Sequence, residues 1–257
     1  MSADPAAPAD DWPEGVARHV LREVDSTNAE AARLAPHLTR PTWILALRQT
    51  AGRGRRGREW RDPPGNFAAT LVMRPEGGAG QAALRSFVAA LAVHEALTLA
   101  AGPAARLSIK WPNDVLLNGG KVAGVLLEGL GQGAGLQHLA VGIGVNLAQA
   151  PPASDLGQTN VPPVSLRGET GIAVAPEEFL SLLGPAFARW EASLVTWGFA
   201  PLRTAWLARA ARLGQTVTAR TMRDSVTGVF ETIDETGALV LATPGGRVTI
   251  PAADVYF

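Results

Sequence analysis

The stretch "DVLLNGGKVAGVLLEG", residues 114–129, predicts two strands joined by a tight turn. Apolar residues flank the Asn-Gly-Gly at 118–120, and Asn-Gly supplies the positive backbone angles that a short hairpin turn requires. Further strands are predicted before it in "LSIKWP", residues 107–112, and after it in "LQHLAVGIGVNL", residues 136–147. Strands in direct succession favour an antiparallel or mixed sheet.

Two helices are predicted to flank this sheet. Residues 82–100 carry apolar side chains such as Leu84, Phe87 and Leu91 at intervals of three and four, the period of one helix face. A second helix begins at about Pro176 and shows the same period. Helices beside a mixed sheet indicate the α+β class.

A third helix begins in "VDSTNAEAARLA", residues 24–35. Thr27 and Glu30 have the spacing of a capping box, in which two side chains bind the free N–H groups at the start of a helix. We therefore expect the side chains just before this helix to be held in place.

The stretch "QTAGRGRRGREW", residues 49–60, concentrates arginine and glycine in a chain whose formal net charge is zero. Strands predicted in residues 42–50 and 66–74 hold it at both ends. Guanidinium groups bind phosphate and carboxylate oxygens in pairs, and glycine lets a backbone approach a ligand closely. The stretch fits a loop that wraps an anionic ligand, although a solvated linker or an RNA-binding patch has the same composition.

A second polar constellation is "KWPNDVLLNGGK", residues 110–121, with Lys110, Asn113, Asp114 and Lys121. A turn that exposes a carboxylate, an amide and amines beside a basic loop has the groups needed to handle an acid and a phosphate. An ordinary solvated turn is the alternative, because Pro-Asn-Asp favours turns.

In "VGIGVN", residues 141–146, Gly142 and Gly144 interrupt a predicted strand, which marks a bulge or a place where a ligand presses on the backbone. Asn146 would offer its amide at the end of that strand. The sequence also holds four scattered histidines: His19, His37, His94 and His138. This scatter disfavours a zinc site or a hydrolase triad.

Composition limits the classes of function. At 257 residues and 47% hydrophobic content, the chain can bury a full core. Lys+Arg and Asp+Glu balance at 23 each, so the overall charge does not indicate a nucleic-acid binder. The absence of cysteine excludes disulfides and fits a cytoplasmic location. We find no secretory signal and no run of about 18 apolar residues that predicts a membrane span.

Three regions are predicted along the chain. Residues 1–20 form a disordered extension rich in proline and alanine. Residues 21–212 form the main domain and include a mobile loop at 147–175. Residues 213–257 carry short alternating strands that predict a small β-barrel. No helix-turn-helix is expected before residue 24.

Taken in order, "DSTN", "QTAGRGRRGREW", "KWPNDVLLNGGKVAGVLLE" and "GIGVNL" resemble the biotin protein ligases, also called biotin–[acetyl-CoA-carboxylase] ligases. The resemblance runs from about Val24 to the end of the chain. It implies a class II synthetase-like catalytic domain, followed by an SH3-like β-barrel. It also implies that biotin and ATP, with Mg²⁺, give biotinyl-5′-adenylate, and that a lysine of a biotin carboxyl carrier protein domain then takes the biotin.

The resemblance assigns one group of residues to biotin. Ser26, Thr27 and Asn28 match the segment that hydrogen-bonds the ureido ring, and Gln49 matches a residue beside that pocket. The other residues matched to biotin are Arg53, Gly54, Arg55, Lys121 and Gly124.

A second group is matched to ATP or the adenylate. Trp60 matches an aromatic wall against the adenine, and Arg55 belongs to the loop over the adenylate phosphate. Asn113 and Asn146 complete this group.

The implied catalytic residues are Arg53, Asp114 and Lys121. Arg53 and Lys121, with the Mg²⁺ that ATP carries, would offset the repulsion between the biotin carboxylate and the α-phosphate. Asp114 would orient the acceptor lysine or accept its proton. The protein is not expected to hold a metal of its own.

The sequence departs from the family in two places. Thr70 stands where serine is common, and residues 147–163 do not align, so the adenosine contacts of that loop are left open. Family members that repress transcription carry an N-terminal winged helix-turn-helix, and we expect a ligase without repressor activity or specific DNA binding.

The nearest alternative is a lipoate or octanoate ligase or transferase of the same fold. "GRGRRG" and "KWPND" disfavour it, because those enzymes carry a glycine-rich motif with a histidine. A nucleic-acid-binding module is disfavoured by the neutral net charge. A homodimer through an exposed sheet edge is left open by the sequence.

Overall fold

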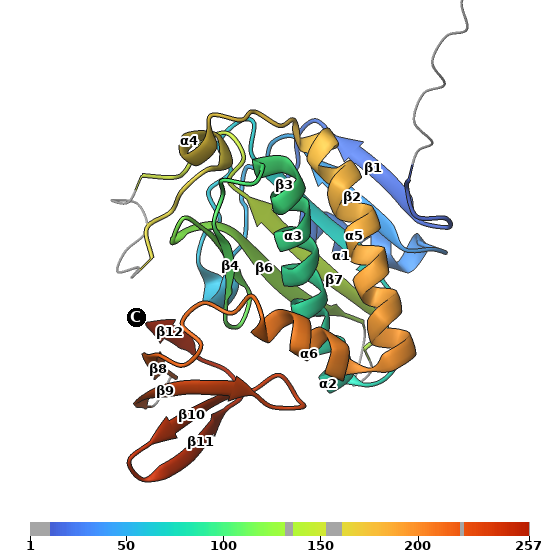
Figure 1. Ribbon diagram of the computed structural model, residues 1–257. Coiled ribbons are helices and arrows are strands. Elements are labelled where there is room, and N and C mark those ends of the chain that lie inside the picture. The colour runs from blue at the N-terminus through green and yellow to red at the C-terminus, as the bar shows by residue number, and fades with distance from the viewer. Residues whose placement is uncertain (1–10, 132–135, 153–160, 222–223, 257) are drawn as a thin grey trace, which may run out of the picture.

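A large mixed sheet forms the centre of the protein. The computed structural model describes residues 11–131, 136–152, 161–221 and 224–256 (Figure 1). Within them the sheet strands are β1 (Ala17–Leu21), β2 (Thr42–Ala46), β3 (Phe67–Met73), β4 (Leu107–Lys110), β5 (Asp114–Leu117), β6 (Gly120–Leu130) and β7 (His138–Val145). Their order is β1-β2-β3-β7-β6-β5-β4. The pair β1 and β2 is parallel and the other neighbouring pairs are antiparallel.

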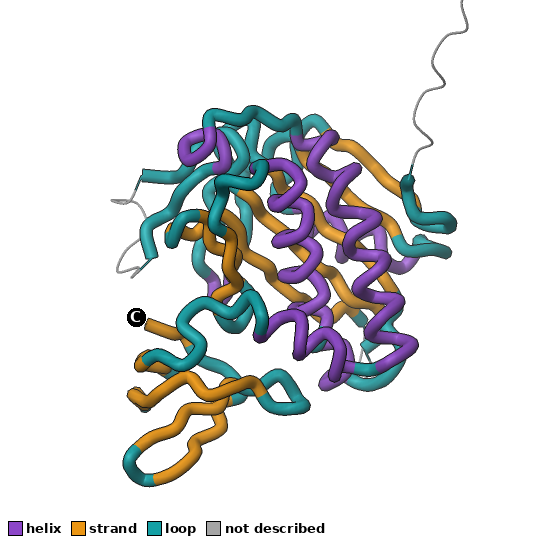
Figure 2. The backbone as a smooth tube through the Cα atoms, viewed as in Figure 1, coloured by secondary structure: helices purple, strands orange, loops and turns teal. Residues whose placement is uncertain are grey.

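Helices cover both faces of this sheet. They are α1 (Thr27–Leu34), α2 (Ala79–Ala83), α3 (Arg85–Ala101), α4 (Leu166–Thr170), α5 (Pro176–Trp197) and α6 (Phe199–Leu207). The long helices α3 and α5 lie side by side on one face (Figure 2). Helix α1 packs on the other face through Ala31, which joins Ile44 and Val72 in a separate apolar cluster.

A second, smaller sheet follows α6 and lies at one end of the molecule (Figure 1). Its strands are β8 (Thr216–Arg220), β9 (Ser225–Ile233), β10 (Leu239–Thr243), β11 (Gly246–Ile250) and β12 (Asp254–Tyr256). The order β11-β10-β9-β8-β12 is antiparallel throughout. The large mixed sheet with helices and the small antiparallel sheet confirm the α+β class.

The hairpin predicted at residues 118–120 is confirmed. Asn118 and Gly119 have φ angles of 51° and 88°, the positive values expected of such a turn. It joins β5 to β6 as predicted. The helices predicted at 82–100 and from Pro176 correspond to α3 and α5.

The predicted disorder of residues 1–20 is wrong for the part that the structure describes. Residues 17–20 belong to β1, which pairs with β2, and Trp12 packs against Gly184 of α5. The indole N–H of Trp12 donates to the Val16 carbonyl at 2.8 Å. Residues 1–10 lie outside the described residues. The strand was missed because its side chains stay largely exposed, so no apolar alternation marks it.

The predicted mobile loop at 147–175 is wrong for its second half. It contains α4, and the backbone N–H of Lys121 donates to the Pro162 carbonyl at 2.8 Å. The backbone N–H of Val164 donates to the Lys121 carbonyl at 2.9 Å. Residues 153–160 lie outside the described residues. The composition of this segment predicts a loop, because its backbone bonds to Lys121 of β6 leave no periodic pattern of side chains in the sequence.

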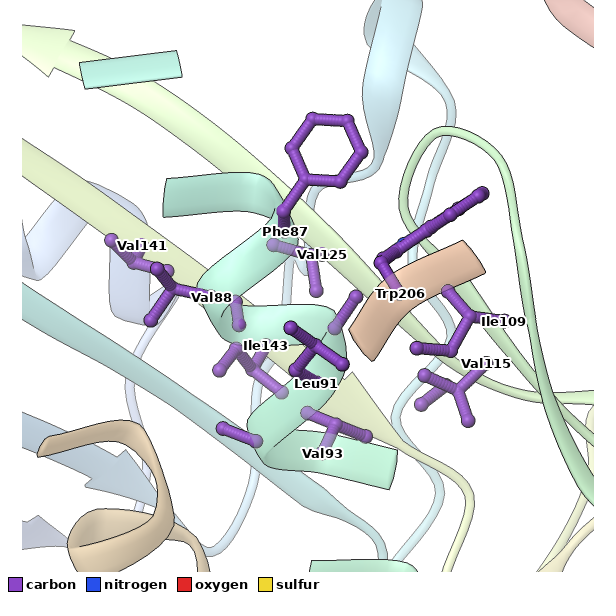
Figure 3. Close-up of a cluster of buried hydrophobic side chains, with 14 of the residues drawn as sticks. Phe87, Val88, Leu91, Val93, Ile109, Val115, Val125, Val141, Ile143 and Trp206 are labelled. Carbon is purple, nitrogen blue, oxygen red and sulfur yellow. The ribbon is translucent and has the colours of Figure 1, made fainter. Parts of the chain in front are cut away.

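The pleat of the strands separates core side chains from the opposite face. Successive residues of a strand point to opposite sides. In β7, Val141 and Ile143 face α3, where they pack against Val88 and Leu91 (Figure 3). Gly142, which lies between them in β7, therefore points to the face on which α1 lies.

Among the residues that the structure describes, one apolar stretch meets the length and hydropathy expected of a membrane span. Residues Ala79–Ala101 form α2 and α3, and most of this stretch is buried inside the protein. It is therefore explained as a core helix.

A buried ion pair joins the two long helices. Arg85 of α3 is 3% exposed, and its guanidinium lies 2.7 Å from a carboxylate oxygen of Glu191 in α5. Removing one partner of such a pair leaves a buried charge without compensation. We expect Glu191→Ala to lower the free energy of unfolding by about 3 kcal/mol.

Urea unfolding followed by tryptophan fluorescence measures this loss. The control is Glu231→Ala, because its partner Arg247 is 74% exposed and such surface pairs contribute little to stability. Equal losses in the two variants would contradict the stabilising role of the buried pair.

Candidate functional site

The residues singled out in the sequence meet at one cavity. It has a volume of about 200 Å³ and lies on the sheet face opposite α3 and α5. The sequence-predicted residues that line it are Ser26, Thr27, Asn28, Gln49, Arg53, Gly54, Arg55, Trp60, Asn113, Asp114, Lys121, Gly124 and Asn146. Four separate segments of the sequence thus contribute to a single site.

A hydrogen-bonded network forms one wall of the cavity. Oε1 of Gln49 accepts from the Thr27 backbone N–H at 2.8 Å and from its hydroxyl at 3.2 Å. The hydroxyl of Thr70, on β3, lies 2.8 Å from Oγ1 of Thr27 and 2.6 Å from Oδ1 of Asn28. Nδ2 of Asn28 donates to Glu128 at 2.6 Å. The network fixes the donors and acceptors that this wall presents.

The predicted capping box at the start of α1 is wrong. Ser26 occupies the cap position without a side-chain bond, and Glu30 pairs with Arg33 at 2.6 Å. The Thr27 hydroxyl instead hydrogen-bonds Gln49 and Thr70 in the wall of the cavity. Asp25 holds this helix start through its carboxylate, which lies 2.6 Å from the Arg33 guanidinium and accepts from the Ser26 N–H at 2.8 Å. These two contacts lower the pKa of the Asp25 carboxyl to about 2. For Thr27, the distant residue Gln49 takes the place of the predicted local partner.

The arginine-rich stretch is a hairpin that folds over the cavity. The N–H of Trp60 donates to the Gly52 carbonyl at 3.0 Å, and the N–H of Gly54 donates to the Arg58 carbonyl at 2.7 Å. A guanidinium N–H of Arg55 donates to Oδ1 of Asn113 at 3.1 Å. This last bond ties the hairpin to the turn between β4 and β5.

Opposite charges concentrate on the other wall. Nζ of Lys121 lies 2.6 Å from a carboxylate oxygen of Asp114. Burial lowers the pKa of Lys110, and Lys121 adds to that shift while Asp114 opposes it. Desolvated cations attract anionic ligands more strongly than hydrated ones. The wall is suited to a ligand that carries carboxylate or phosphate oxygens.

Glycines make room for the side chains of the site. A Cβ added to Gly142 would overlap Asn28, and one added to Gly144 would overlap the ring of Trp60. The pairing of β7 with β3 and β6 runs without a register shift, so the predicted bulge is wrong. What approaches the backbone is the protein's own side chains.

Trp60 and Asn146 also line the cavity, and their hydrogen-bonding states differ. Nε1 of Trp60 is buried and has no acceptor among the described residues. A buried donor without a partner is costly, so it points to an acceptor on a ligand. Asn146 donates through Nδ2 to the Val164 carbonyl at 3.0 Å, which fixes its amide at the end of β7.

The sequence assigned no role to several residues that the structure brings to the cavity. Arg58 lies within the arginine-rich stretch, where nothing distinguished it from the neighbouring arginines, and Lys110 was named in the polar constellation at 110–121 but was assigned to no ligand. Asp254 and Tyr256 come from β12, and Asp254 lies 3.4 Å from the Arg58 guanidinium. No local signal could have found them, because their contribution depends on how the small sheet packs.

A buried carboxyl supports the network from below. Oδ2 of Asp62 accepts from the backbone N–H of Gln49 at 3.1 Å, and Oδ1 is buried without a partner among the described residues. Burial raises the pKa of Asp62 to about 6, against the bond from Gln49. Asp62 thus closes the base of the arginine hairpin.

The described residues hold no group of three or more His, Asp or Glu side chains arranged to bind a metal ion. The cavity itself contains carboxylates from Asp114 and Asp254. One or two carboxylates suffice for Mg²⁺ when phosphate oxygens complete the coordination.

The raised pKa of Asp62 predicts a pH-dependent stability. The native state holds its proton more tightly than the unfolded chain, so the stabilisation is complete below pH 3.8 and is lost as the pH rises through about 6. Asp62→Asn, which cannot ionise, should therefore exceed the wild type in free energy of unfolding by on the order of 2 kcal/mol at pH 7.5 and by little at pH 4.

Urea titrations between pH 4 and 7.5 measure this difference. Asp224→Asn, at an exposed aspartate, serves as the control and should follow the wild type at each pH. If the Asp62→Asn and wild-type curves ran parallel, burial of the ionised carboxyl would not be the cause.

Known proteins share both parts of this architecture. Residues 20–146 match the Biotin/lipoate A/B protein ligase family, and residues 213–257 match the Biotin protein ligase C terminal domain. A biotin--[acetyl-CoA-carboxylase] ligase of Paracoccus denitrificans is 65% identical over 93% of this chain and 99% of its own length. The bifunctional ligase/repressor BirA of Bacillus subtilis is 32% identical over 83% of this chain and 65% of its own length.

A solved structure extends the likeness to three dimensions. The biotin protein ligase from Aquifex aeolicus in complex with biotin and ATP matches with a TM-score of 0.79 at 27% identity, covering 93% of this chain and 97% of that one. The Paracoccus protein is similar over almost the whole of both chains. On this evidence the chain belongs to the biotin protein ligase family.

Proposed function

We propose that this protein activates biotin with ATP and transfers it to a lysine of the biotin carboxyl carrier protein domain of an acetyl-CoA carboxylase. The observation that carries the proposal is the meeting of four sequence segments at one cavity with a polar wall and a wall of paired charges that includes Lys110 and Lys121. The names of the Paracoccus and Aquifex relatives support it, since one is a biotin--[acetyl-CoA-carboxylase] ligase and the other was solved with biotin and ATP.

In the first step a biotin carboxylate oxygen bonds to the α-phosphorus of ATP, and the bond to pyrophosphate breaks. We assign the ureido ring to Ser26, Thr27, Asn28 and Gln49, whose network fixes its donors and acceptors. The ureido group needs such matched partners because it carries N–H donors and a carbonyl acceptor.

Cations make the first step feasible because both reactants are anions. Lys121 is assigned to the biotin carboxylate and the phosphate, with Arg53, Gly54 and Arg55 folded over them. Mg²⁺ bound to ATP would supply further positive charge at the phosphates, and Asp114 is placed to contribute a carboxylate. The hairpin also excludes water from the anhydride product.

The adenosine side of the cavity is assigned to a second set of residues. Trp60 lies against Gly144 and close to Gly124, and forms a wall for the adenine. Asn113 and Asn146 are fixed by hydrogen bonds and present amides to the adenylate.

In the second step the acceptor lysine attacks the acyl carbon, AMP leaves, and the nitrogen loses a proton. Asp114 is the carboxylate placed to orient that amine or take its proton. Its present partner, Lys121, is 33% exposed and is a primary amine like the incoming lysine. The pair supports the assignment, because it places an ammonium group against the Asp114 carboxylate.

The remaining parts of the proposal concern organisation. We divide the chain into a catalytic domain at 21–212 and a C-terminal domain at 213–257, and place it in the cytoplasm. A homodimer is proposed through β1, which lies at one edge of the large sheet and leaves Val20 49% exposed.

Biotin-dependent exchange between ATP and pyrophosphate tests the first step. Lys121→Gln removes the charge and should lower kcat/KM for exchange by about 10²–10³-fold, because the charge acts in the transition state. Arg48→Gln is the control, since Arg48 is 62% exposed and lies outside the cavity. Exchange driven by lipoate rather than biotin would favour the lipoate ligase alternative.

Transfer from purified biotinyl-5′-adenylate tests the role of Asp114. Asp114→Asn keeps the size of the side chain and removes the negative charge, so transfer to a carrier domain should slow by about 10²-fold or more. Single-turnover assays separate this step from adenylation. Slower adenylation with normal transfer would refute the assignment.

A further inference from the structure

A hydrogen bond joins the Lys110–Asp114 turn, which we call the catalytic turn, to the small C-terminal sheet of β8 to β12. Trp111 lies between Lys110 and the residues Asn113 and Asp114, and its side chain is 3% exposed. Its indole N–H donates to the Gly237 carbonyl at 2.9 Å, in a buried contact. Gly237 belongs to the turn between β9 and β10, so the bond crosses from one sheet to the other.

The accepting turn is held rigid by one aspartate. Oδ1 of Asp234 accepts from the Thr236 N–H at 2.8 Å, from its hydroxyl at 2.7 Å and from the Ala238 N–H at 2.9 Å. Burial raises the pKa of Asp234, but these bonds outweigh it, so the pKa is lowered. Asp234 therefore fixes the direction of the Gly237 carbonyl.

Tight packing leaves the turn little room to shift. Gly237 has φ of 84°, and a Cβ added there would overlap the ring of Phe87 in α3. Phe87 in turn contacts Trp206 edge to face, at 5.7 Å between ring centroids. The Gly237 carbonyl is thus a fixed acceptor, set by α3 on one side and by Asp234 on the other.

On its other side, Trp111 leads directly into the site. Asn113, two residues on, binds the Val125 carbonyl through Nδ2 and accepts the Arg55 guanidinium on Oδ1. Asp114 follows and pairs with Lys121. A rotation of the backbone at Trp111 would move both side chains, because they lie within one turn of chain.

We propose that the Asp234–Ala238 turn of the C-terminal sheet positions the Lys110–Asp114 turn for adenylation, through the bond from Trp111 to Gly237. Trp111 and Asp234 are then positioning residues that act through Asn113 and Asp114. The inference rests on the proposed function, since it concerns the same reaction. It gives the C-terminal sheet a role in the phosphate half of the site, separate from the biotin wall.

Trp111→Phe tests this bond with little change in packing. It keeps an aromatic ring and removes the N–H, which leaves the Gly237 carbonyl unpaired. We expect kcat for biotin-dependent ATP–pyrophosphate exchange to fall by about ten-fold, with KM for biotin unchanged. A merely structural role would lower the melting temperature and leave kcat at 20 °C unaltered.

Trp206→Phe is the matched control. Trp206 is buried at the same junction, but its indole Nε1 has no acceptor in the part of the chain that the structure describes. Phenylalanine keeps an aromatic ring against Phe87, so the packing behind Gly237 is preserved and this replacement should leave kcat at the wild-type value. A loss of kcat in both variants to the same degree would overturn the proposal.

The aspartate gives an independent test from outside the cavity. Asp234→Ala removes the acceptor and should reproduce the loss in kcat, whereas Asp234→Asn keeps an oxygen at Oδ1 and should restore most of it. The double variant Trp111→Phe/Asp234→Ala should be no slower than Trp111→Phe alone, because both changes break one connection. Should Trp111→Phe fail to fold, the Asp234 pair decides.

The outcomes separate this inference from the proposed function. A wild-type protein without biotin-dependent exchange would overturn the proposed function, and the inference with it. An active wild type with wild-type kcat in Trp111→Phe, or in Asp234→Ala, would overturn the inference alone. Additive losses in the double variant would also overturn it, because two independent effects would then be acting.

Discussion

The pleat of β3 and β7 is the constraint on which the cavity depends. Large apolar residues alternate there with small or polar ones, so one face of the sheet is filled by α3 and α5 and the other keeps free space. On that second face Gly142 lies beside Thr70 in register. A side chain at Gly142 would displace Asn28, and one at Gly144 would displace Trp60, so the polar wall could not form.

Long-range hydrogen bonds then convert this space into a specific site. Gln49, which follows β2, holds Thr27 at the start of α1, and Asn28 reaches Glu128 on β6. Each bond joins elements distant in sequence, so the wall forms only when the sheet is complete. Buried polar groups that are all paired favour one arrangement over alternatives. Asp62 departs from this pattern, because one of its oxygens has no partner among the described residues.

The arginine hairpin contacts both sheets as well as covering the cavity. Arg55 binds Asn113 of the catalytic turn, and Arg58 lies 3.4 Å from Asp254 of β12. The Trp111 indole N–H also donates to the Gly237 carbonyl, in the turn between β9 and β10 of the same small sheet. The part of the cavity near Asp114 is therefore built between the two sheets, while the part around Thr27 and Asn28 is built on the large sheet. A change in how the two sheets pack would affect the first part more than the second.

Local patterns in the sequence determined the α+β class, the hairpin at 118–120, the helices α3 and α5, and most of the polar residues around the cavity. These features depend on periodicity, on turn chemistry and on motifs that resemble a known family. Tertiary structure alone decided that Thr27 binds Gln49 rather than forming the predicted capping box. It also decided that β1 pairs with β2. It also decided the arrival of Asp254 at the site. Such contacts join residues far apart in the chain, and no local period records them.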